Sequence, residues 1–194
     1  MGSQAPDSEL ISASATSPGD FAAIFDRHFD AVYLYLQRRI GRDLAEELAA
    51  ETFLVAFDLR DRYDGSRGEA RPWLLGIATN LLRRHWRREV RELRAYARSA
   101  VDPVLDCFDG IEERLDAAGE RRYLLEALAE LSAPERDALL LAAWADLSYA
   151  EIAAALAVPV GTVRSRLSRA RERIASALRE TDAASAAANR SIGG

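Results

Sequence analysis

The most constraining feature of this sequence is a pair of short helical patterns in residues 147–174, separated by Pro159. Ser148, followed three residues later by Glu151, forms the pattern of a capping box, which begins a helix. After Pro159, apolar residues recur every three or four positions, as one face of an α-helix requires. These residues are Val160, Val163, Leu167, Ala170, Ile174 and Leu178. The spacing therefore predicts a short helix, a tight turn and a second helix with one apolar face.

The opposite face of this second helix is rich in arginine and hydroxyl groups. At about 100° per residue, the face and its two flanks hold Thr162, Arg164, Ser165, Arg166, Arg169 and Arg173. Residues 160–180 contain six arginines and two glutamates, whereas a merely solvated face usually mixes both signs. The planar guanidinium group suits guanine edges and phosphates. The pattern favours a helix-turn-helix that enters the DNA major groove, with a solvated charged face as the alternative.

A second basic helix is predicted in residues 71–94, with Pro72 in its first turn. One side is apolar, and the other carries Trp73, Asn80, Arg83, Arg84, Arg87 and Arg91. An aromatic ring offers a surface on which an unstacked base can lie, and arginines neutralise its phosphates. Trp73 and Trp86 can instead be core residues, and for Trp86 the core is the favoured interpretation.

The distribution of charge separates these two helices from the rest of the chain. The 194 residues carry a net charge of −5, yet residues 66–94 have eight arginines against three acidic residues. Residues 95–120 have two arginines against seven acidic residues, and residues 20–64 have six against ten. A polyanion responds to the local field, so the acidic average does not exclude a nucleic-acid partner. Abundant alanine, leucine, arginine and glutamate, with few β-branched residues, predict an all-helical protein.

The remaining segments complete the organisation. Apolar residues at helical spacing predict helices over 20–39 and 43–63, the latter with an acidic face that is either solvated or a docking surface for a basic partner. Residues 63–70 have the composition of a loop. Residues 1–17 are expected to form a disordered leader, and residues from 181 a disordered tail.

Several functional classes lack their sequence signals. Cys107 is the only cysteine, and His28 and His85 are far apart, so neither a disulfide framework nor a metal site is expected. No apolar run reaches the length of a membrane span, and no signal peptide is evident, which favours a cytoplasmic protein. The motifs of metal-dependent, phosphate-loop and nucleophile-elbow enzymes are absent, so neither an enzyme nor a cofactor is expected.

Two helical units, each with one basic helix, resemble the extracytoplasmic-function sigma factors of bacterial RNA polymerase, over about residues 20–180. The segments that carry the resemblance are AEE at 45–47, ETF at 51–53, RPWLLGIATN at 71–80, LSYAEIA at 147–153 and PVGTVRSRLSRAR at 159–171. The resemblance implies an all-α fold of two small helical domains joined by a flexible linker, the C-terminal one a helix-turn-helix. The implied division is 18–95 for region 2, 96–118 for an acidic linker and 119–180 for region 4, between a leader at 1–17 and a tail at 181–194.

The resemblance also implies partners and sites. The implied partners are promoter DNA, the largest-subunit coiled coil and the flap of core RNA polymerase, and an anti-sigma protein. The duplex −35 element would be bound by Thr162, Arg164, Ser165, Arg166, Ser168, Arg169 and Arg173. The opened −10 element would be bound by Tyr63, Arg67, Arg71, Trp73, Asn80, Arg83, Arg84 and Arg87, with one base flipped into a pocket beside the 63–71 loop. Polymerase docking would involve Glu46, Glu47, Glu51, Phe53 and Asp58.

Three positions depart from the family's pattern. Ala157 and Asp146 stand where glycine is common, and alanine in a left-handed conformation at position 157 would cost about 1 kcal/mol. Ser168 is smaller than the usual residue, which leaves the base preference there open. The alternative function is a stand-alone helix-turn-helix regulator, in which residues 20–95 form a sensing or dimerising domain. Such a domain would have no need of a basic stripe on its own helix.

Overall fold

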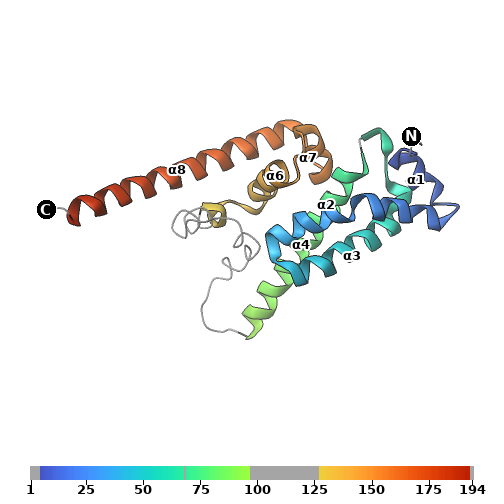
Figure 1. The fold of residues 1–194 in the computed structure, drawn as a ribbon, viewed down its shortest axis with the longest axis horizontal. Coiled ribbons are helices and arrows are strands. Elements are labelled where there is room, and N and C mark those ends of the chain that lie inside the picture. The colour runs from blue at the N-terminus through green and yellow to red at the C-terminus, as the bar shows by residue number, and fades with distance from the viewer. Residues whose placement is uncertain (1–4, 68, 97–126, 193–194) are drawn as a thin grey trace.

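The computed structural model describes residues 5–67, 69–96 and 127–192, and these ranges contain helices and turns but no strand. The elements are α1 (Asp7–Ala13), η1 (Pro18–Phe21), α2 (Ala22–Ile40), α3 (Arg42–Leu59), η2 (Arg60–Arg62), η3 (Gly65–Arg67), α4 (Ala70–Tyr96), α6 (Ala133–Trp144), α7 (Tyr149–Leu156) and α8 (Val160–Ile192) (Figure 1). The prediction of an all-helical protein is confirmed.

The N-terminal unit is a bundle in which α2, α3 and α4 pack against one another. Gly41 alone separates α2 from α3, and its φ of 77° lies in the left-handed region that glycine adopts without a Cβ clash. The side chains of Leu36 and Leu74 are fully buried between the helices. One side of α4 is not covered by α2 and α3, and α7 packs against α4.

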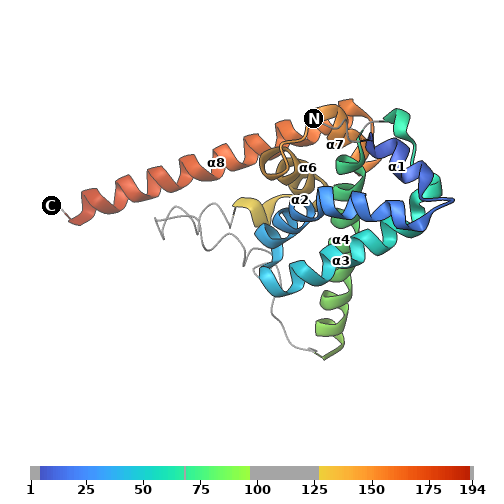
Figure 2. The same cartoon turned by 45° about the vertical axis from the view of Figure 1, so that its right-hand side comes forward.

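The C-terminal unit consists of α6, α7 and the first half of α8. Val163, Leu167 and Ala170 on α8 are fully buried, as their spacing predicts. Both α6 and α7 begin with capping boxes, formed by Ser132 with Glu135 and by Ser148 with Glu151. α8 continues as one long helix away from the other elements (Figure 2).

The two units are in direct contact through α4 and α7. Gly76 on α4 lies so close to α7 that an added Cβ would be 2.3 Å from the carbonyl oxygen of Ala155. Arg71 donates a hydrogen bond of 2.8 Å to the carbonyl of Ala145, and Arg38 donates one of 3.0 Å to the carbonyl of Trp144. Apolar side chains of both units consequently form one contiguous core.

Two terminal segments differ from the expectation of disorder. Residues 7–13 form α1, because Ile11 is buried against the bundle and Asp7 forms an ion pair with Arg27 and a hydrogen bond with His28. In the tail, α8 continues to Ile192 through an alanine-rich stretch, which has high helix propensity. The expected linker lies, from residue 97 onward, outside the described residues.

Candidate nucleic-acid interfaces

The outer face of α8 is solvent-exposed opposite its buried side. Arg164, Ser165, Ser168, Arg169 and Arg173 are exposed, and Thr162 and Arg166 are half-buried. The structure thus places all seven residues predicted for the −35 element on one helix.

Hydrogen bonds and an acidic neighbour orient part of this face. The hydroxyl of Ser165 donates to the carbonyl of Thr162 at 2.9 Å, and Nε of Arg169 donates to the carbonyl of Ser165 at 3.2 Å. Arg169 and Arg173 each lie 3.5 Å from a carboxylate oxygen of Glu135, although their side chains remain 59% and 51% exposed. A hydrogen bond from Ser132 lowers the pKa of Glu135, and the two arginines lower it further. Glu135 therefore remains charged and holds both arginines on the α6 side of the face.

The turn between α7 and α8 has the strained geometry that the missing glycine suggests. Ala157 has φ 52° and ψ 46°, a left-handed C-cap. The amide of Val158 donates to the carbonyl of Ala153 at 3.0 Å, which closes the end of α7. Asp146, the second departure, has φ 51°. Neither residue lies on the exposed face of α8, so the strain concerns stability rather than contact with DNA.

The basic face of α4 is divided between solvent and the C-terminal unit. Asn80, Arg84 and Arg87 are exposed, whereas Arg71 and Arg83 point toward α6 and its following turn. Arg83 donates through Nε to Oδ2 of Asp137 and is a third exposed. The predicted basic face is present, but Arg71 and Arg83 are engaged by the C-terminal unit.

Asp137 on α6 is the acidic partner of Arg83. Its carboxylate is buried and also forms an ion pair of 2.7 Å with Arg39. Arg39 in turn donates to the hydroxyl of Tyr35 at 2.7 Å, and this hydroxyl shares a hydrogen bond of 2.9 Å with Thr79. Burial raises the pKa of Tyr35. A continuous polar network therefore connects α2, α4 and α6.

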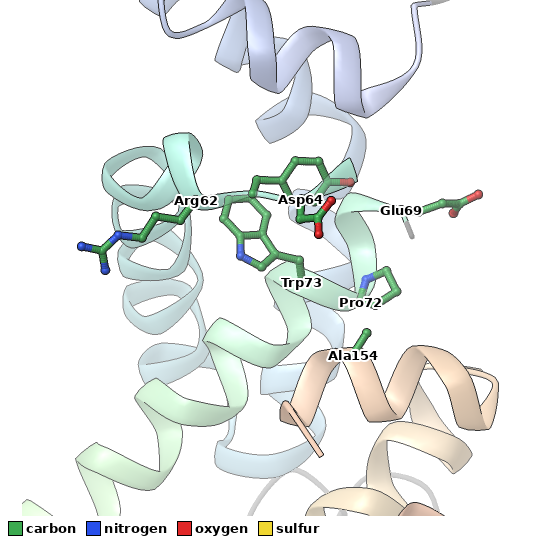
Figure 3. A pocket seen from close by; sticks show the side chains of 7 residues that line it. Arg62, Asp64, Glu69, Pro72, Trp73 and Ala154 are labelled. Carbon is green, nitrogen blue, oxygen red and sulfur yellow. The ribbon is translucent and has the colours of Figure 1, made fainter. Parts of the chain in front are cut away.

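A cavity of about 280 Å³ lies at the start of α4, near the lower end of the range for small-ligand sites. It is lined by Arg62, Tyr63, Asp64, Glu69, Pro72, Trp73 and Ala154. Trp73 projects from α4 toward the Arg62–Asp64 segment, and Ala154 approaches from α7 (Figure 3). The rings of Tyr63 and Trp73 have centroids 4.9 Å apart and planes inclined at 46°.

The loop beside this cavity is held by local hydrogen bonds. Asp64 accepts hydrogen bonds from the amide of Ser66 at 3.0 Å and from its hydroxyl at 2.6 Å. Burial raises the pKa of Tyr63, and Asp7 raises it further, so its phenol is neutral at physiological pH. Arg67 ends η3, but its side chain lies outside the described residues. Trp86 packs against the core, as expected.

The acidic side of α3 differs from the prediction at two positions. Glu46, Glu47, Glu51 and Asp58 are exposed as expected. Phe53 is instead a core residue, 5% exposed, with its ring 4.9 Å from that of Phe25. Leu54, the apolar residue that follows Phe53, is 68% exposed beside the acidic residues. Sequence reasoning missed Leu54 because the adjacent residues Phe53 and Leu54 are both apolar, and only one of them can face inward.

Other classes of site are not evident in the described part of the chain. Among its residues, no group of three or more histidine, cysteine, aspartate or glutamate side chains is arranged to hold a metal ion. No helix in the described ranges is both long and apolar enough to cross a membrane.

Comparison with known proteins matches the two units separately. The model of sigma-70 region 2 matches residues 24–92, and that of sigma-70 region 4 matches residues 121–174. The sigma factor SigC of Mycobacterium tuberculosis is 37% identical over 132 residues, which are 66% of this chain and 66% of SigC. CarQ of Myxococcus xanthus, an RNA polymerase sigma factor, is 33% identical over 166 residues, covering 84% of this chain and 91% of CarQ.

A solved structure gives the same result for the fold. The sigma factor RpoE of Bartonella quintana, in complex with the anti-sigma factor NepR, has a TM-score of 0.61 and 25% identity. The similarity covers 82% of this chain and 97% of RpoE. With regions 2 and 4 in order and relatives matched along most of the length, this chain belongs to the extracytoplasmic-function group of the sigma-70 family, the RNA polymerase sigma factors that recognise promoters in transcription initiation.

Proposed function

We propose that this sigma factor directs core RNA polymerase to promoters by binding the −35 element as duplex through α8 and the −10 element as opened single strand through α4. The observation that carries the proposal is the presence of two arginine-rich helix faces, one in each unit of a chain whose net charge is −5. The proposed role is that of a non-enzymatic specificity subunit acting in the cytoplasm.

For the duplex element, α8 has the dimensions and chemistry of a recognition helix. An α-helix fits the major groove, where each base pair presents a distinct set of donors and acceptors. Arg164 and Arg169 can donate two hydrogen bonds to a guanine, while Ser165 and Ser168 are short enough to allow close approach. Thr162, Arg166 and Arg173 lie at the flanks or further along the helix, where phosphates are the expected contacts.

For the opened element, the cavity beside Trp73 supplies a place for one unstacked base. The base would stack on the tilted pair of Tyr63 and Trp73, and stacking on an aromatic ring contributes about 1–3 kcal/mol per base. The exposed residues Asn80, Arg84 and Arg87 would follow the strand along α4. Arg71 and Arg83 would join them once their side chains face DNA, and Arg67 is proposed as a further contact with the strand.

For polymerase, the acidic side of α3 is the proposed docking surface, directed at the coiled coil of the largest subunit. Leu54 gives it an apolar anchor among Glu47, Glu51 and Asp58, an arrangement suited to a partner with a basic rim and an apolar centre. Contact between the C-terminal unit and the polymerase flap completes the proposed assembly. An anti-sigma partner, as RpoE has in its complex, would bind when the protein is silent.

In vitro transcription with core polymerase tests the DNA assignment. On a library varied in the duplex element, Arg169→Ala should lose about 1–3 kcal/mol of discrimination, or roughly 5- to 150-fold, at one base position. Arg179→Ala, an exposed arginine further along α8, serves as the control and should leave the preference unchanged. A uniform loss across all sequences would assign Arg169 to a phosphate. Tight promoter binding without polymerase at physiological salt would favour the stand-alone regulator.

A further inference from the structure

Helix α1, in the segment that precedes region 2, is firmly docked on the bundle. Ile11 is 2% exposed within the core, and the hydroxyl of Ser14 is buried and donates to the carbonyl of Ile11 at 2.6 Å. At the other end of the helix, Asp7 lies 3.0 Å from Arg27 and 2.6 Å from Nε2 of His28. An apolar anchor and an ion-pair cluster, both directed at the bundle, fix α1 at its two ends.

Between these anchors, α1 contacts the segment that borders the proposed base pocket, residues 60–67. Nε of Arg60 donates to the carbonyl of Ser14 at 3.4 Å. Gly65 lies against α1 so closely that an added Cβ would be 2.7 Å from Cβ of Ser8. α1 and its C-cap residue Ser14 therefore touch the middle and the beginning of this segment.

Tyr63 links α1 to the pocket. It lines the cavity beside Trp73 and also a second cavity of about 390 Å³ on the other side of the segment. The second cavity is lined by Ser8, Ile11, Ser12 and Ala15 on the α1 side and by Arg60, Asp61, Tyr63 and Gly65 on the other. One side of Tyr63 thus faces the place proposed for the base, and the other faces α1.

We propose that α1 is a positioning element for the −10 pocket, which holds residues 60–67 and the Tyr63 ring in the geometry that discriminates between bases. This inference rests on the proposed function of the pocket. The 60–67 segment contains two short 3₁₀ turns with few buried side chains, and ordering such a backbone costs conformational entropy. Contact with a docked helix supplies that order before the base arrives, and a preorganised site discriminates more sharply than a mobile one.

The test uses holoenzyme, assembled from core polymerase and the full chain, on templates with a pre-melted −10 bubble. Each position of the non-template strand in the bubble is varied over the four bases, in a promoter first selected from a random library by the unmodified holoenzyme. The measured quantity is the ratio of initiation on the best and the worst base at each position. Core binding and the −35 preference are measured in parallel.

Two independent variants disrupt the contact between α1 and residues 60–67, one with a substitution in α1 and one with a substitution in the 60–67 segment. Ile11→Asp should undock α1, and Ala13→Asp, which adds the same carboxylate at an exposed position of the same helix, is its control. Gly65→Ala should push α1 and the segment apart, and adding Ser8→Gly should restore the contact by removing the clashing Cβ.

The expected result is a loss of at least fivefold in base discrimination at one −10 position for Ile11→Asp and Gly65→Ala. Discrimination should be retained in Ala13→Asp and recovered in the Ser8→Gly, Gly65→Ala double variant, with core binding and the −35 preference unchanged throughout. If the unmodified protein discriminates and Gly65→Ala discriminates equally well, the role of α1 is overturned while the pocket stands. If the unmodified protein shows no −10 preference, both the pocket and the role of α1 are overturned.

Discussion

At the scale of single residues, the turn between α7 and α8 contains a substitution site with a predictable effect. Ala157 has φ 52°, where an L-residue with a Cβ is strained by about 1–2 kcal/mol and glycine is not. We therefore expect Ala157→Gly to raise the free energy of unfolding by about 1 kcal/mol, after allowance for the greater chain entropy of glycine. Denaturant unfolding measures the change.

The matched control lies three residues earlier. Ala154 is exposed within the right-handed part of α7, so Ala154→Gly should lower the free energy of unfolding by about 1 kcal/mol. If the free energy of unfolding rises with Ala157→Gly and falls with Ala154→Gly, the left-handed conformation of Ala157 is the cause of the strain. Equal destabilisation at both would show that Ala157 is not strained in solution.

Individual residues also show how far sequence reasoning extends. The absence of glycine at position 157 is visible in the sequence, and the capping box at Ser148 follows from local spacing. The orientations of Phe53 and Leu54 do not follow from local spacing. Adjacent residues of an α-helix point about 100° apart, and when both are apolar the sequence does not show which of them faces the core. Tertiary packing decides it: the ring of Phe53 fits beside Phe25, and Leu54 remains outside.

At the scale of elements, the acidic side of α3 makes a prediction about assembly. Reversing charge with Glu47→Arg and Glu51→Arg together should abolish copurification with core polymerase, because a basic-rimmed partner would meet like charge across the interface. Asp26→Arg and Asp30→Arg, at exposed positions of α2, produce the same change in net charge and serve as controls.

The two pairs distinguish a docking surface from a general charge effect. Binding lost only with the α3 pair supports docking through α3, and binding lost with both pairs indicates a response to net charge alone. Copurification that survives the α3 pair contradicts the assignment. A circular dichroism spectrum of each variant checks that the bundle is intact.

Elements differ in how much of them a sequence can predict. The helices of both units follow from apolar residues at helical spacing, and α8 keeps Arg164, Arg169 and Arg173 exposed because its buried residues occupy the other side. α1 is missed because seven residues give too short a pattern, and its order comes from partners 20 and 21 residues away, Arg27 and His28. Local composition does not contain that information.

At the scale of the whole molecule, the two units are packed together in a way that occupies parts of the proposed DNA surface. Asp137 holds Arg83 of the α4 stripe, Arg71 is bound to the carbonyl of Ala145, and Ala154 of α7 borders the base pocket. Arg83 and Asp137 are 54 residues apart and Arg71 and Ala145 are 74 apart, so no local pattern indicates these contacts. Full contact of α4 with a DNA strand therefore requires α6 and α7 to move away.

The polar part of this interface contributes little net free energy to holding the two units together. A buried ion pair such as that between Asp137 and Arg83 gains attraction but loses hydration, and the two effects nearly cancel. The backbones of α4 and α7 come into direct contact at Gly76. This contact is possible only because residue 76 has no side chain. The packing should consequently be sensitive to one added methyl group.

Gly76→Ala is the substitution that examines this packing. Its Cβ would lie 2.3 Å from the carbonyl oxygen of Ala155, a distance that neither backbone can accept, so α7 must shift away from α4. Alanine also favours helix over glycine by about 1 kcal/mol, so an opening cannot come from a weakened α4. We expect a larger radius of gyration in small-angle scattering and faster amide exchange along α7, with α2 unchanged.

Gly161→Ala provides the comparison, because Gly161 is also helical and an added Cβ there meets nothing within 4 Å. It should leave both the radius of gyration and the exchange of α7 as they are. If Gly76→Ala behaves in the same way, the two units are not held by the close approach of α4 and α7. If it opens the molecule, holoenzyme containing this variant should also initiate faster at limiting sigma factor, because Arg71 and Arg83 would already be available to the −10 strand.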